Sequence, residues 1–200
     1  DQAGRANILS RFRELGIEID SKDPRVLKIV DEVKQREYQG YSYDGAEASF
    51  ELLARELTEG LPTYFSIETF RVLDEHRMDS AGLAEALSEA TVKVSVGATR
   101  VLEVSEGNGP VNALDHALRK ALAPFYPSLV DVRLTDYRVR ILNSGDGTAA
   151  VTRVMLESAD ASGKRWTTVG LSGDIISASY EALTEGLIYK LMSDGVAPPV

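Results

Sequence analysis

The side chains most able to do chemistry in this chain are two histidines, His76 and His116. They lie far apart and form neither the His-x-His pair nor the His-Glu-x-x-His motif that commonly binds a metal. No serine lies in a Gly-x-Ser-x-Gly motif with a histidine placed to activate it. The absence of cysteine excludes thiol catalysis and disulfides. His116 falls on the helix side away from Leu114 and Leu118, which predicts a surface histidine.

Composition narrows the classes of partner. A net charge of −9 argues against nucleic acid, because phosphate binding needs a clustered basic face. No apolar run approaches the ~20 residues of a membrane span, and no basic leader with an apolar core is present. We therefore expect a cytoplasmic protein without a membrane partner. The scattered acidic residues predict solvated faces and no metal site; they include Asp131, Asp136, Glu157 and Asp160.

The stretch best suited to hold a ligand runs from Glu106 to Leu114. Gly107 and Gly109 end a β-type run, and Pro110 opens a helix. A helix N-terminus can hold a carboxylate, and glycines let a ligand approach the backbone closely. The alternative is a tight strand-to-helix turn with Pro110 at the first helical position. The third glycine of a dinucleotide fingerprint and the Lys-Ser/Thr of a P-loop are both absent.

This junction recurs loosely at 171–179. The two copies are related by an offset of 65, since 176 − 111 = 65. Periodic self-similarity of this kind indicates a repeated structural unit. The pairs that keep the offset are Val111/Ile176, Ala113/Ala178, Ala117/Ala182, Leu118/Leu183 and Leu122/Leu187.

Apolar spacing and turn residues predict the elements that carry the two junctions. Ser21 or Asp23 can cap a helix that begins with Pro24 and ends at Gly40. The region 78–88 is ambiguous, either a loop or a short exposed helix. The other expected helices cover 3–15, 44–57, 110–123 and 174–192. The expected strands cover 64–73, 91–96, 99–105, 130–142, 151–157 and 165–171, with an Asp-Gly hairpin at 143–147.

Each half of the later chain therefore contains three strands followed by a helix. The pattern predicts an α+β fold, with a helical linker module over 1–60 and a domain over 61–200. Within that domain, two βββα repeats cover about 63–124 and 129–193, related by a pseudo-twofold axis. Open antiparallel sheets leave edges that need cover, so we expect a homodimer. The alternative is a monomer whose edges are protected by Lys and Arg.

Three segments are distinctive: Ala-Glu-Ala-Ser-Phe-Glu-Leu-Leu at 46–53, Glu-Gly-Asn-Gly-Pro-Val-Asn-Ala-Leu-Asp at 106–115, and Trp-Thr-Thr-Val-Gly-Leu-Ser at 166–172. Together with other stretches they resemble the C-terminal half of citramalate synthases, within the wider α-isopropylmalate and homocitrate synthase family. The resemblance covers nearly the whole chain, with its segments in the family's order. The other similar segments are 3–9, 40–45, 89–94, 134–141 and 147–149.

The resemblance implies a fold and a partner. Family members carry an N-terminal TIM barrel that binds a divalent metal and condenses acetyl-CoA with a 2-oxo acid. A TIM barrel needs ~250 residues, so this chain lacks one and is expected to be inactive alone, with no cofactor or catalytic residue of its own. What remains resembles the linker and the LeuA-type allosteric domain, which has two βββα repeats, dimerises, and binds an end-product amino acid at the interface.

The resemblance also implies site residues. Leu134, Ile141 and Ile175 would line an apolar slot, while Tyr137 and the helix N-termini would meet the charged end of the ligand. In the family the linker lends a tyrosine to the partner's barrel, and Tyr41 or Tyr43 is the candidate. The full effector set is Val111, Asn112, Leu134, Tyr137, Ile141, Thr148, Gly173 and Ile175, with Gly107, Gly109 and Pro110 forming the turn.

The expected function is the regulatory part of an (R)-citramalate synthase, which makes citramalate from acetyl-CoA and pyruvate in isoleucine biosynthesis. Isoleucine would act as feedback inhibitor, and the N-terminal barrel of the same chain would be a partner. Gln2, where many isopropylmalate synthases have histidine, favours the citramalate branch. The alternatives are the leucine-sensing domain of an α-isopropylmalate synthase and a non-enzymatic dimerisation or small-ligand module. A free-standing enzyme is disfavoured, for want of a nucleophile–base pair.

Overall fold

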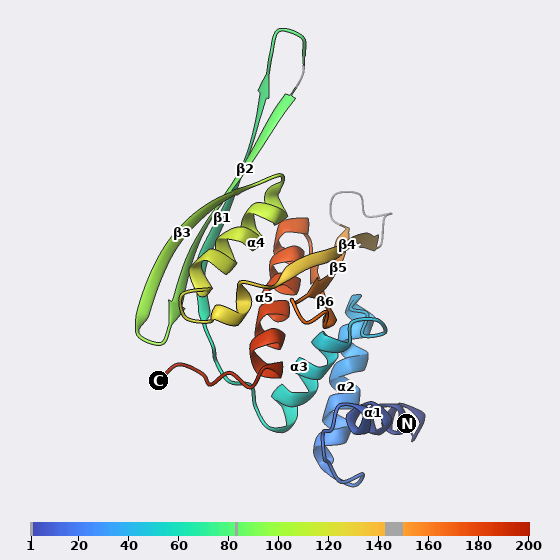
Figure 1. Ribbon diagram of the computed structural model, residues 1–200. Helices are drawn as coiled ribbons and strands as arrows, with labels where there is room; N and C mark the ends of the chain where they lie inside the picture. The colour runs from blue at the N-terminus through green and yellow to red at the C-terminus, as the bar shows by residue number, and fades with distance from the viewer. Residues whose placement is uncertain (1, 83, 143–149) are drawn as a thin grey trace. The chain divides into compact units, whose positions relative to one another are not determined.

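The computed structural model describes residues 2–82, 84–142 and 150–200 and has the expected α+β class (Figure 1). Two runs of three strands and a helix follow a module of three helices, which confirms the predicted repeats. The elements in order are α1 Gln2–Glu14, α2 Pro24–Gln39, α3 Glu47–Thr58, β1 Ser66–Met78, β2 Ala84–Val96, β3 Thr99–Gly107, α4 Pro110–Leu122, the 3-10 helix η1 Pro127–Leu129, β4 Arg133–Leu142, β5 Val151–Ala159, β6 Arg165–Ser172 and α5 Ile175–Ser193.

The chain divides into two compact units that do not follow the linear order of the repeats. The first compact unit comprises residues 1–61, 136–157 and 166–186. The second compact unit comprises residues 62–135, 158–165 and 187–200. The first therefore contains the helical module with most of β4–β6 and α5, and the second contains β1–β3 with α4.

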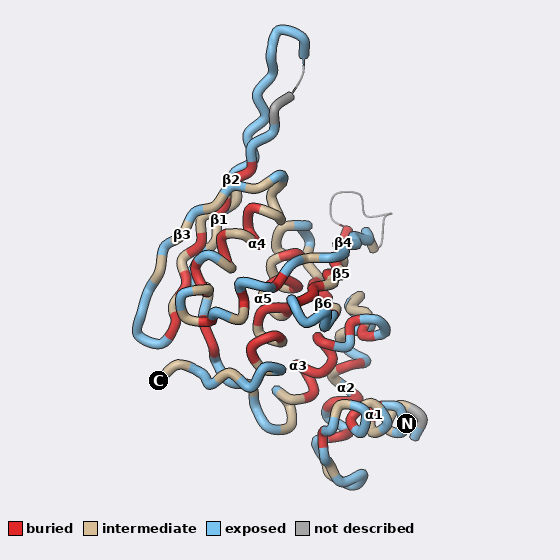
Figure 2. The backbone as a smooth tube through the Cα atoms, in the orientation of Figure 1, coloured by how far each residue is buried: buried red, intermediate tan, exposed pale blue. Residues whose placement is uncertain are grey.

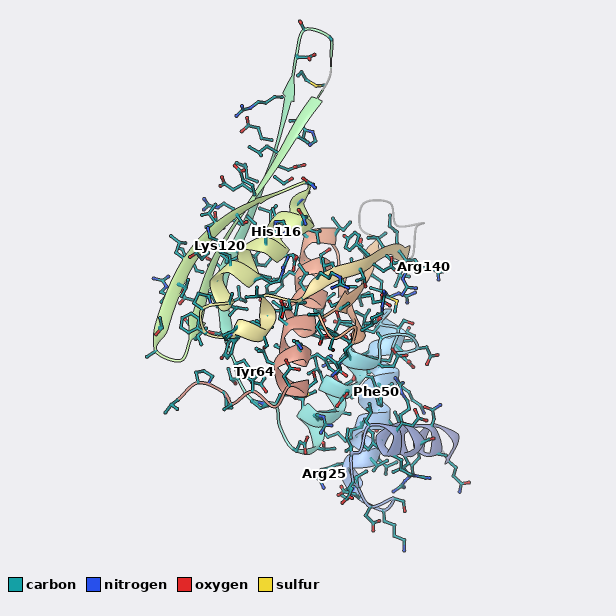
Figure 3. The ribbon with its side chains drawn as sticks, in the orientation of Figure 1. Arg25, Phe50, Tyr64, His116, Lys120 and Arg140 are labelled. Atoms are coloured by element: carbon teal, nitrogen blue, oxygen red, sulfur yellow. The ribbon has the colours of Figure 1, made fainter. Side chains whose placement is uncertain are left out.

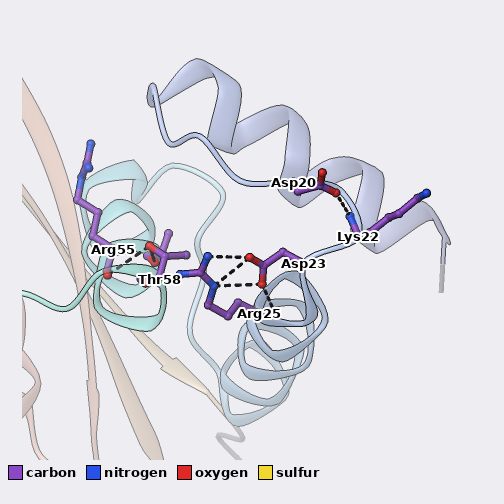
Figure 4. Close-up of polar contacts among 7 residues, drawn as sticks. Asp20, Lys22, Asp23, Arg25, Arg55 and Thr58 are labelled. Atoms are coloured by element: carbon purple, nitrogen blue, oxygen red, sulfur yellow. Dashed lines mark hydrogen bonds and ion pairs between the residues drawn. The ribbon is translucent and has the colours of Figure 1, made fainter.

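Helix α2 begins and ends as its sequence predicts. The Asp23 carboxylate accepts a hydrogen bond from the Arg25 amide at 2.8 Å, and Gly40 ends the helix with φ of 122°. The Arg25 guanidinium also pairs with Asp23 and donates to the Thr58 carbonyl at 2.7 Å, which fastens α2 to α3 (Figure 4). Helix α3 starts at Glu47 and not at residue 44 as expected, because Gly45 takes a φ of 87°.

A single apolar cluster holds the helical module to β6 within the first compact unit. Phe12, Phe50 and Tyr43 are its largest rings, each at most 2% exposed. The Arg11 guanidinium lies 3.5 Å from the centroid of the Phe50 ring, a cation–π contact at the edge of the cluster. The remaining buried members are Ile8, Ile17, Val26, Ile29, Val30, Val33, Ala46, Leu53, Ala54 and Val169.

The second compact unit is built on an antiparallel sheet of order β1-β2-β3. Strand β2 alternates between buried and partly buried residues from Ser88 to Val96 (Figure 2), and α4 lies along the sheet (Figure 1). Burial of small and branched side chains on both elements lets the helix approach closely. The inward residues are Ala90, Val92, Val94 and Val96 on β2, and Ala113, Leu114, Ala117, Leu118, Ala121 and Leu122 on α4.

The region 78–88, expected to be a loop or a short helix, is strand at Met78 and from Ala84 onwards, while residues 79–82 form a turn. Strand β1 runs to Met78, and β2 begins at Ala84 in register with it. The Ser88 hydroxyl donates to the Asp74 carboxylate at 2.6 Å across the two strands. The polar composition hides the strand period, because these strands extend beyond β3 and do not need an apolar face. Cross-strand pairing carried over from the buried part of β1 and β2 decides the conformation.

The second sheet has the order β4-β5-β6 and is followed by α5. In the first compact unit, Gly170 of β6 permits close contact with this helix, since a Cβ there would overlap the backbone of Ala178 and Ala182. The Thr168 hydroxyl donates to the Ala182 carbonyl at 2.6 Å. Strand β4 begins at Arg133, later than expected, because η1 and a turn precede it. The hairpin expected at 143–147 lies outside the described residues.

One acidic residue departs from the predicted solvated faces. Asp160 is 4% exposed and accepts a hydrogen bond from the Lys190 ammonium group at 2.8 Å, within the second compact unit. Hydrogen bonds from Lys190 and Ser162 hold the pKa of its carboxyl well below the ordinary value. Its cation comes from the last turns of α5, and the local sequence contains no sign of it. Asp131 and Asp136 are exposed, as predicted.

Among the helices of the described residues, none combines the length and the apolar character needed to cross a membrane.

Candidate functional site

The first strand-to-helix junction is shaped by one obligatory glycine. A Cβ on Gly107 would overlap the backbone of Ala113, so only glycine lets β3 turn this closely into α4. Gly109 is different: its φ of −177° is ordinary extended backbone, and a Cβ there would meet no atom within 4 Å. Pro110 occupies the first turn of α4, as predicted. The junction therefore leaves open space beside Gly109, at the amino end of the helix.

Side chains of α4 fasten this turn. The Asn112 side-chain oxygen accepts a hydrogen bond from the Asn108 amide at 3.0 Å, and the Asn112 side-chain nitrogen lies 3.3 Å from Nε2 of His116. Nδ1 of His116 lies 3.1 Å from the Glu106 carbonyl oxygen. His116 is partly exposed, which agrees with the predicted surface histidine, and it also contacts both sides of the turn. The asparagine four residues before it is the local signal that could have indicated this.

The second junction opens α5 in the first compact unit. The Asp174 carboxylate accepts a hydrogen bond from the Ser177 amide at 2.8 Å, and hydrogen bonds to Ser177 lower the pKa of this carboxyl. The neighbouring candidate residues face solvent, with Gly173 exposed and Ile175 42% exposed. The start of α5 therefore presents an apolar side chain beside a capped helix N-terminus.

Strand β4 presents a tyrosine to the same helix. The Tyr137 hydroxyl lies 3.0 Å from the Ser179 hydroxyl, which itself donates to the Ile175 carbonyl at 2.6 Å. Ser179 has one hydrogen to donate, so Tyr137 is the donor of the pair. Tyr137 and Ile141 share a strand face because they are four residues apart, and they are 38% and 61% exposed. Strand β4 therefore exposes an apolar side chain and a polar hydroxyl on one face.

The candidate effector residues are divided between the two compact units. Val111, Asn112 and Leu134 belong to the second, and each is partly buried. Tyr137, Ile141, Gly173 and Ile175 belong to the first. Thr148 lies outside the described residues. The assignment of these residues to one pocket stays a prediction.

The two candidate tyrosines of the linker differ sharply in environment. Tyr43 is 2% exposed within the apolar cluster, and burial raises its pKa to about 12. Tyr41 is partly exposed and donates to a carboxylate oxygen of Glu181 at 2.6 Å. Burial and this carboxylate raise the pKa of Tyr41 above its usual range. Tyr41 also lines a polar cavity of about 390 Å³, and the other lining residues are Glu32, Gln35, Arg36, Gln39 and Glu181.

Sequence reasoning missed a pair of acids on α5 that bind the helical module. Glu181 accepts hydrogen bonds from Tyr41 and from the Leu171 amide at 2.9 Å. Glu185, one turn later, accepts a hydrogen bond from the Ser49 hydroxyl. Burial raises the pKa of Glu185 to about 8. Glutamates four residues apart on a predicted helix are common, so only the tertiary contact distinguishes these two.

Comparison with known proteins identifies the family. The sequence-family model of the LeuA allosteric (dimerisation) domain matches residues 44–191. The chain belongs to this family. The (R)-citramalate synthase of Geobacter sulfurreducens is 50% identical to this LeuA-family domain over 191 residues, which are 96% of the chain and 35% of that protein. The (R)-citramalate synthase of Synechocystis is 48% identical over the same proportions of both chains.

A 2-isopropylmalate synthase is more distant. The protein of this name from Pseudoalteromonas atlantica is 27% identical over 166 residues, which cover 79% of the LeuA-family domain and 30% of the relative. The domain thus spans about a third of the length of the relatives it matches (35% for the first two). The names favour the citramalate branch of the family.

Proposed function

We propose that this LeuA-family domain is the regulatory part of an (R)-citramalate synthase and binds isoleucine as a feedback inhibitor. The observation that carries the proposal is identity of 50% over 96% of the chain to a protein of that name, against 27% over 79% for an isopropylmalate synthase. The complete protein would be a cytoplasmic acyltransferase that condenses acetyl-CoA with pyruvate. Its divalent metal and catalytic residues would lie in an N-terminal barrel, and the domain alone would be inactive.

The chemistry of the candidate residues supports a branched-chain amino acid as ligand. The exposed side chains of Ile141 and Ile175 offer apolar surface, and the Tyr137 hydroxyl offers a polar contact. The amino ends of α4 and α5 offer N–H groups and the positive end of a helix dipole for a carboxylate. Each of these features is incomplete alone, and we propose that they meet at a homodimer interface. The family's description as a dimerisation domain supports that assembly.

Feedback requires that isoleucine bind two states of the enzyme with different affinity. Tyr41 would connect the domain to catalysis, because it is the more accessible of the two candidate tyrosines and lines a polar cavity. We propose that Tyr41 extends to the partner's barrel, while Tyr43 serves the linker core.

The first test is calorimetric titration of the domain with isoleucine, leucine and valine. Saturable binding with isoleucine preferred supports the proposal. A preference for leucine would assign the parent protein to the isopropylmalate synthase branch. An apolar pocket distinguishes the two ligands by shape, and the difference in binding free energy is only ~1–3 kcal/mol. A folded dimer that binds none of the three would leave a dimerisation module as the function.

A pair of tyrosine variants locates the ligand. Tyr137→Phe removes the hydroxyl that donates to Ser179, and we expect it to weaken isoleucine binding by about five- to tenfold. Tyr38→Phe is the matched control, because Tyr38 is 94% exposed on α2. Equal affinities for the two variants would remove Tyr137 from the site.

A further inference from the structure

We infer that His116 is a positioning residue of the effector turn, and that it works as a neutral imidazole with its proton on Nδ1. The effector turn is defined as residues 106–112, the end of β3 and the first residues of α4. The ligand part of this inference rests on the proposed function. The hydrogen-bond arrangement rests only on the geometry of the second compact unit.

The donor and the acceptor of each hydrogen bond follow from the groups that can only donate or only accept. The Asn108 amide can only donate, so the Asn112 atom 3.0 Å away is its side-chain oxygen. The Asn112 side-chain nitrogen, which can only donate, then faces Nε2 of His116 at 3.3 Å. Nε2 must therefore accept. The Glu106 carbonyl can only accept, so Nδ1, at 3.1 Å, must carry the proton.

Only one protonation state satisfies every partner. A protonated imidazole would place an N–H at Nε2 against the N–H of Asn112. Rotating the Asn112 amide would relieve that contact but would set its nitrogen against the Asn108 amide. One of the two bonds to the turn is therefore lost whenever the imidazole is charged.

Neighbouring charges on the elements packed against α4 are engaged elsewhere. On the sheet face that α4 covers, the Glu103 carboxylate of β3 pairs with the Lys120 ammonium group at 3.1 Å. Lys120 and His116 both lie on α4 (Figure 3). Asp74 of β1 accepts from Ser88 and pairs with His76 at 2.9 Å. On α4 itself, Asp115 is adjacent to His116 and pairs with Arg119 at 2.6 Å. On β3, Glu106 is three residues from Glu103, so its side chain points to the opposite face of the sheet.

The turn held by His116 sets the N–H groups that a ligand carboxylate would use. The first N–H groups of a helix have no intrahelical partner, and Pro110 has none to offer. The amides of Val111 and Asn112 are therefore the donors at this end of α4, while the Ala113 amide already donates to Gly109 at 2.9 Å. Losing the Asn112 anchor would free the backbone that aims these two donors.

The test uses the full-length protein and measures isoleucine affinity by calorimetry. His116→Ala removes both hydrogen bonds, and we expect the dissociation constant for isoleucine to rise by about tenfold. His116→Asn keeps a donor at the Nδ1 position and should recover affinity to within about threefold of wild type. His76→Ala, the chain's other histidine, is the control and should bind as wild type does.

A further readout separates this inference from the proposed function. Nitrogen NMR of the imidazole should show the Nδ1–H tautomer of His116 at about pH 8. A wild-type protein that binds no isoleucine overturns the proposed function. Binding that His116→Ala leaves intact, or an Nε2–H tautomer, overturns the role of His116 instead.

Discussion

Replacing Glu185 with glutamine should remove a pH dependence of stability from this domain. The carboxyl group of Glu185 accepts a hydrogen bond from Ser49 and lies one turn from Glu181 on α5. Burial is the main cause that raises its pKa, from 4.5 to about 8, with the negative charges of Glu181 and Glu56 adding to it. Glutamine keeps the shape and the acceptor oxygen but carries no charge.

The sign follows from proton binding in the two states. Below about pH 4.5 the carboxyl is protonated in both the folded and the unfolded chain and makes no difference. As the pH rises towards 8, the unfolded chain releases its proton while the folded chain retains it. The free energy of unfolding therefore falls over this window and levels off above it. A tenfold change in proton affinity is worth about 1.4 kcal/mol, and partial exposure of Glu185 reduces the effect, so we expect a loss of about 2–4 kcal/mol.

The assay is urea unfolding of wild type and Glu185→Gln at intervals from about pH 5 to about pH 9. The two proteins should be similar at pH 5, and the variant should be more stable by about 2–4 kcal/mol at pH 9. Glu59→Gln is the control, because the Glu59 side chain is 57% exposed in its pair with Arg55. That variant should keep the wild-type pH profile. A constant difference between wild type and Glu185→Gln at every pH would refute the reasoning.

Two further predictions concern contacts that chain position alone does not reveal. Gly107→Ala should lower the free energy of unfolding by about 2–3 kcal/mol, because the new Cβ would overlap backbone atoms. Gly109→Ala should change it by less than about 0.5 kcal/mol, because a Cβ there meets open space. Denaturant unfolding of both variants checks this, and equal losses of stability would contradict it. Ser49→Ala leaves the buried Val169 amide, which donates to Ser49 at 2.9 Å, without its acceptor and should cost about 1–3 kcal/mol. Ser42→Ala, at a partly exposed serine, is its thermal-unfolding control, and an equal loss of stability in both variants would contradict the role of Ser49.

Most of the secondary structure could be predicted because local signals and tertiary packing agree. Asp23, Pro24 and Gly40 delimit α2 through capping chemistry that acts within a few residues. The alternation of β2 from Ala90 to Val96 and the helical period of α4 each encode one buried face. The outer parts of β1 and β2, which end at Met78 and begin at Ala84, were not predictable in this way, because exposed paired strands need no apolar period.

The candidate site was predictable only in part, for a related reason. The Gly-Asn-Gly-Pro turn marks the start of α4 and the need for glycine at 107, since both are properties of the local backbone. The roles of His116 and Glu185 depend on which groups face them after folding. Sequence spacing places His116 beside Asn112 but does not reveal the Glu106 carbonyl across the turn.

The sequence by itself determined the α+β class, the repeated strand-strand-strand-helix order and the family of this domain. Those properties rest on periodicity, capping and residue order, which are read along the chain. Only the tertiary structure decided that burial raises the pKa of Glu185 and that Asp160 pairs with Lys190 in the interior. The charge state and burial of a side chain depend on partners distant in the chain. Their electrostatic and desolvation energies arise only when folding brings them within a few ångströms.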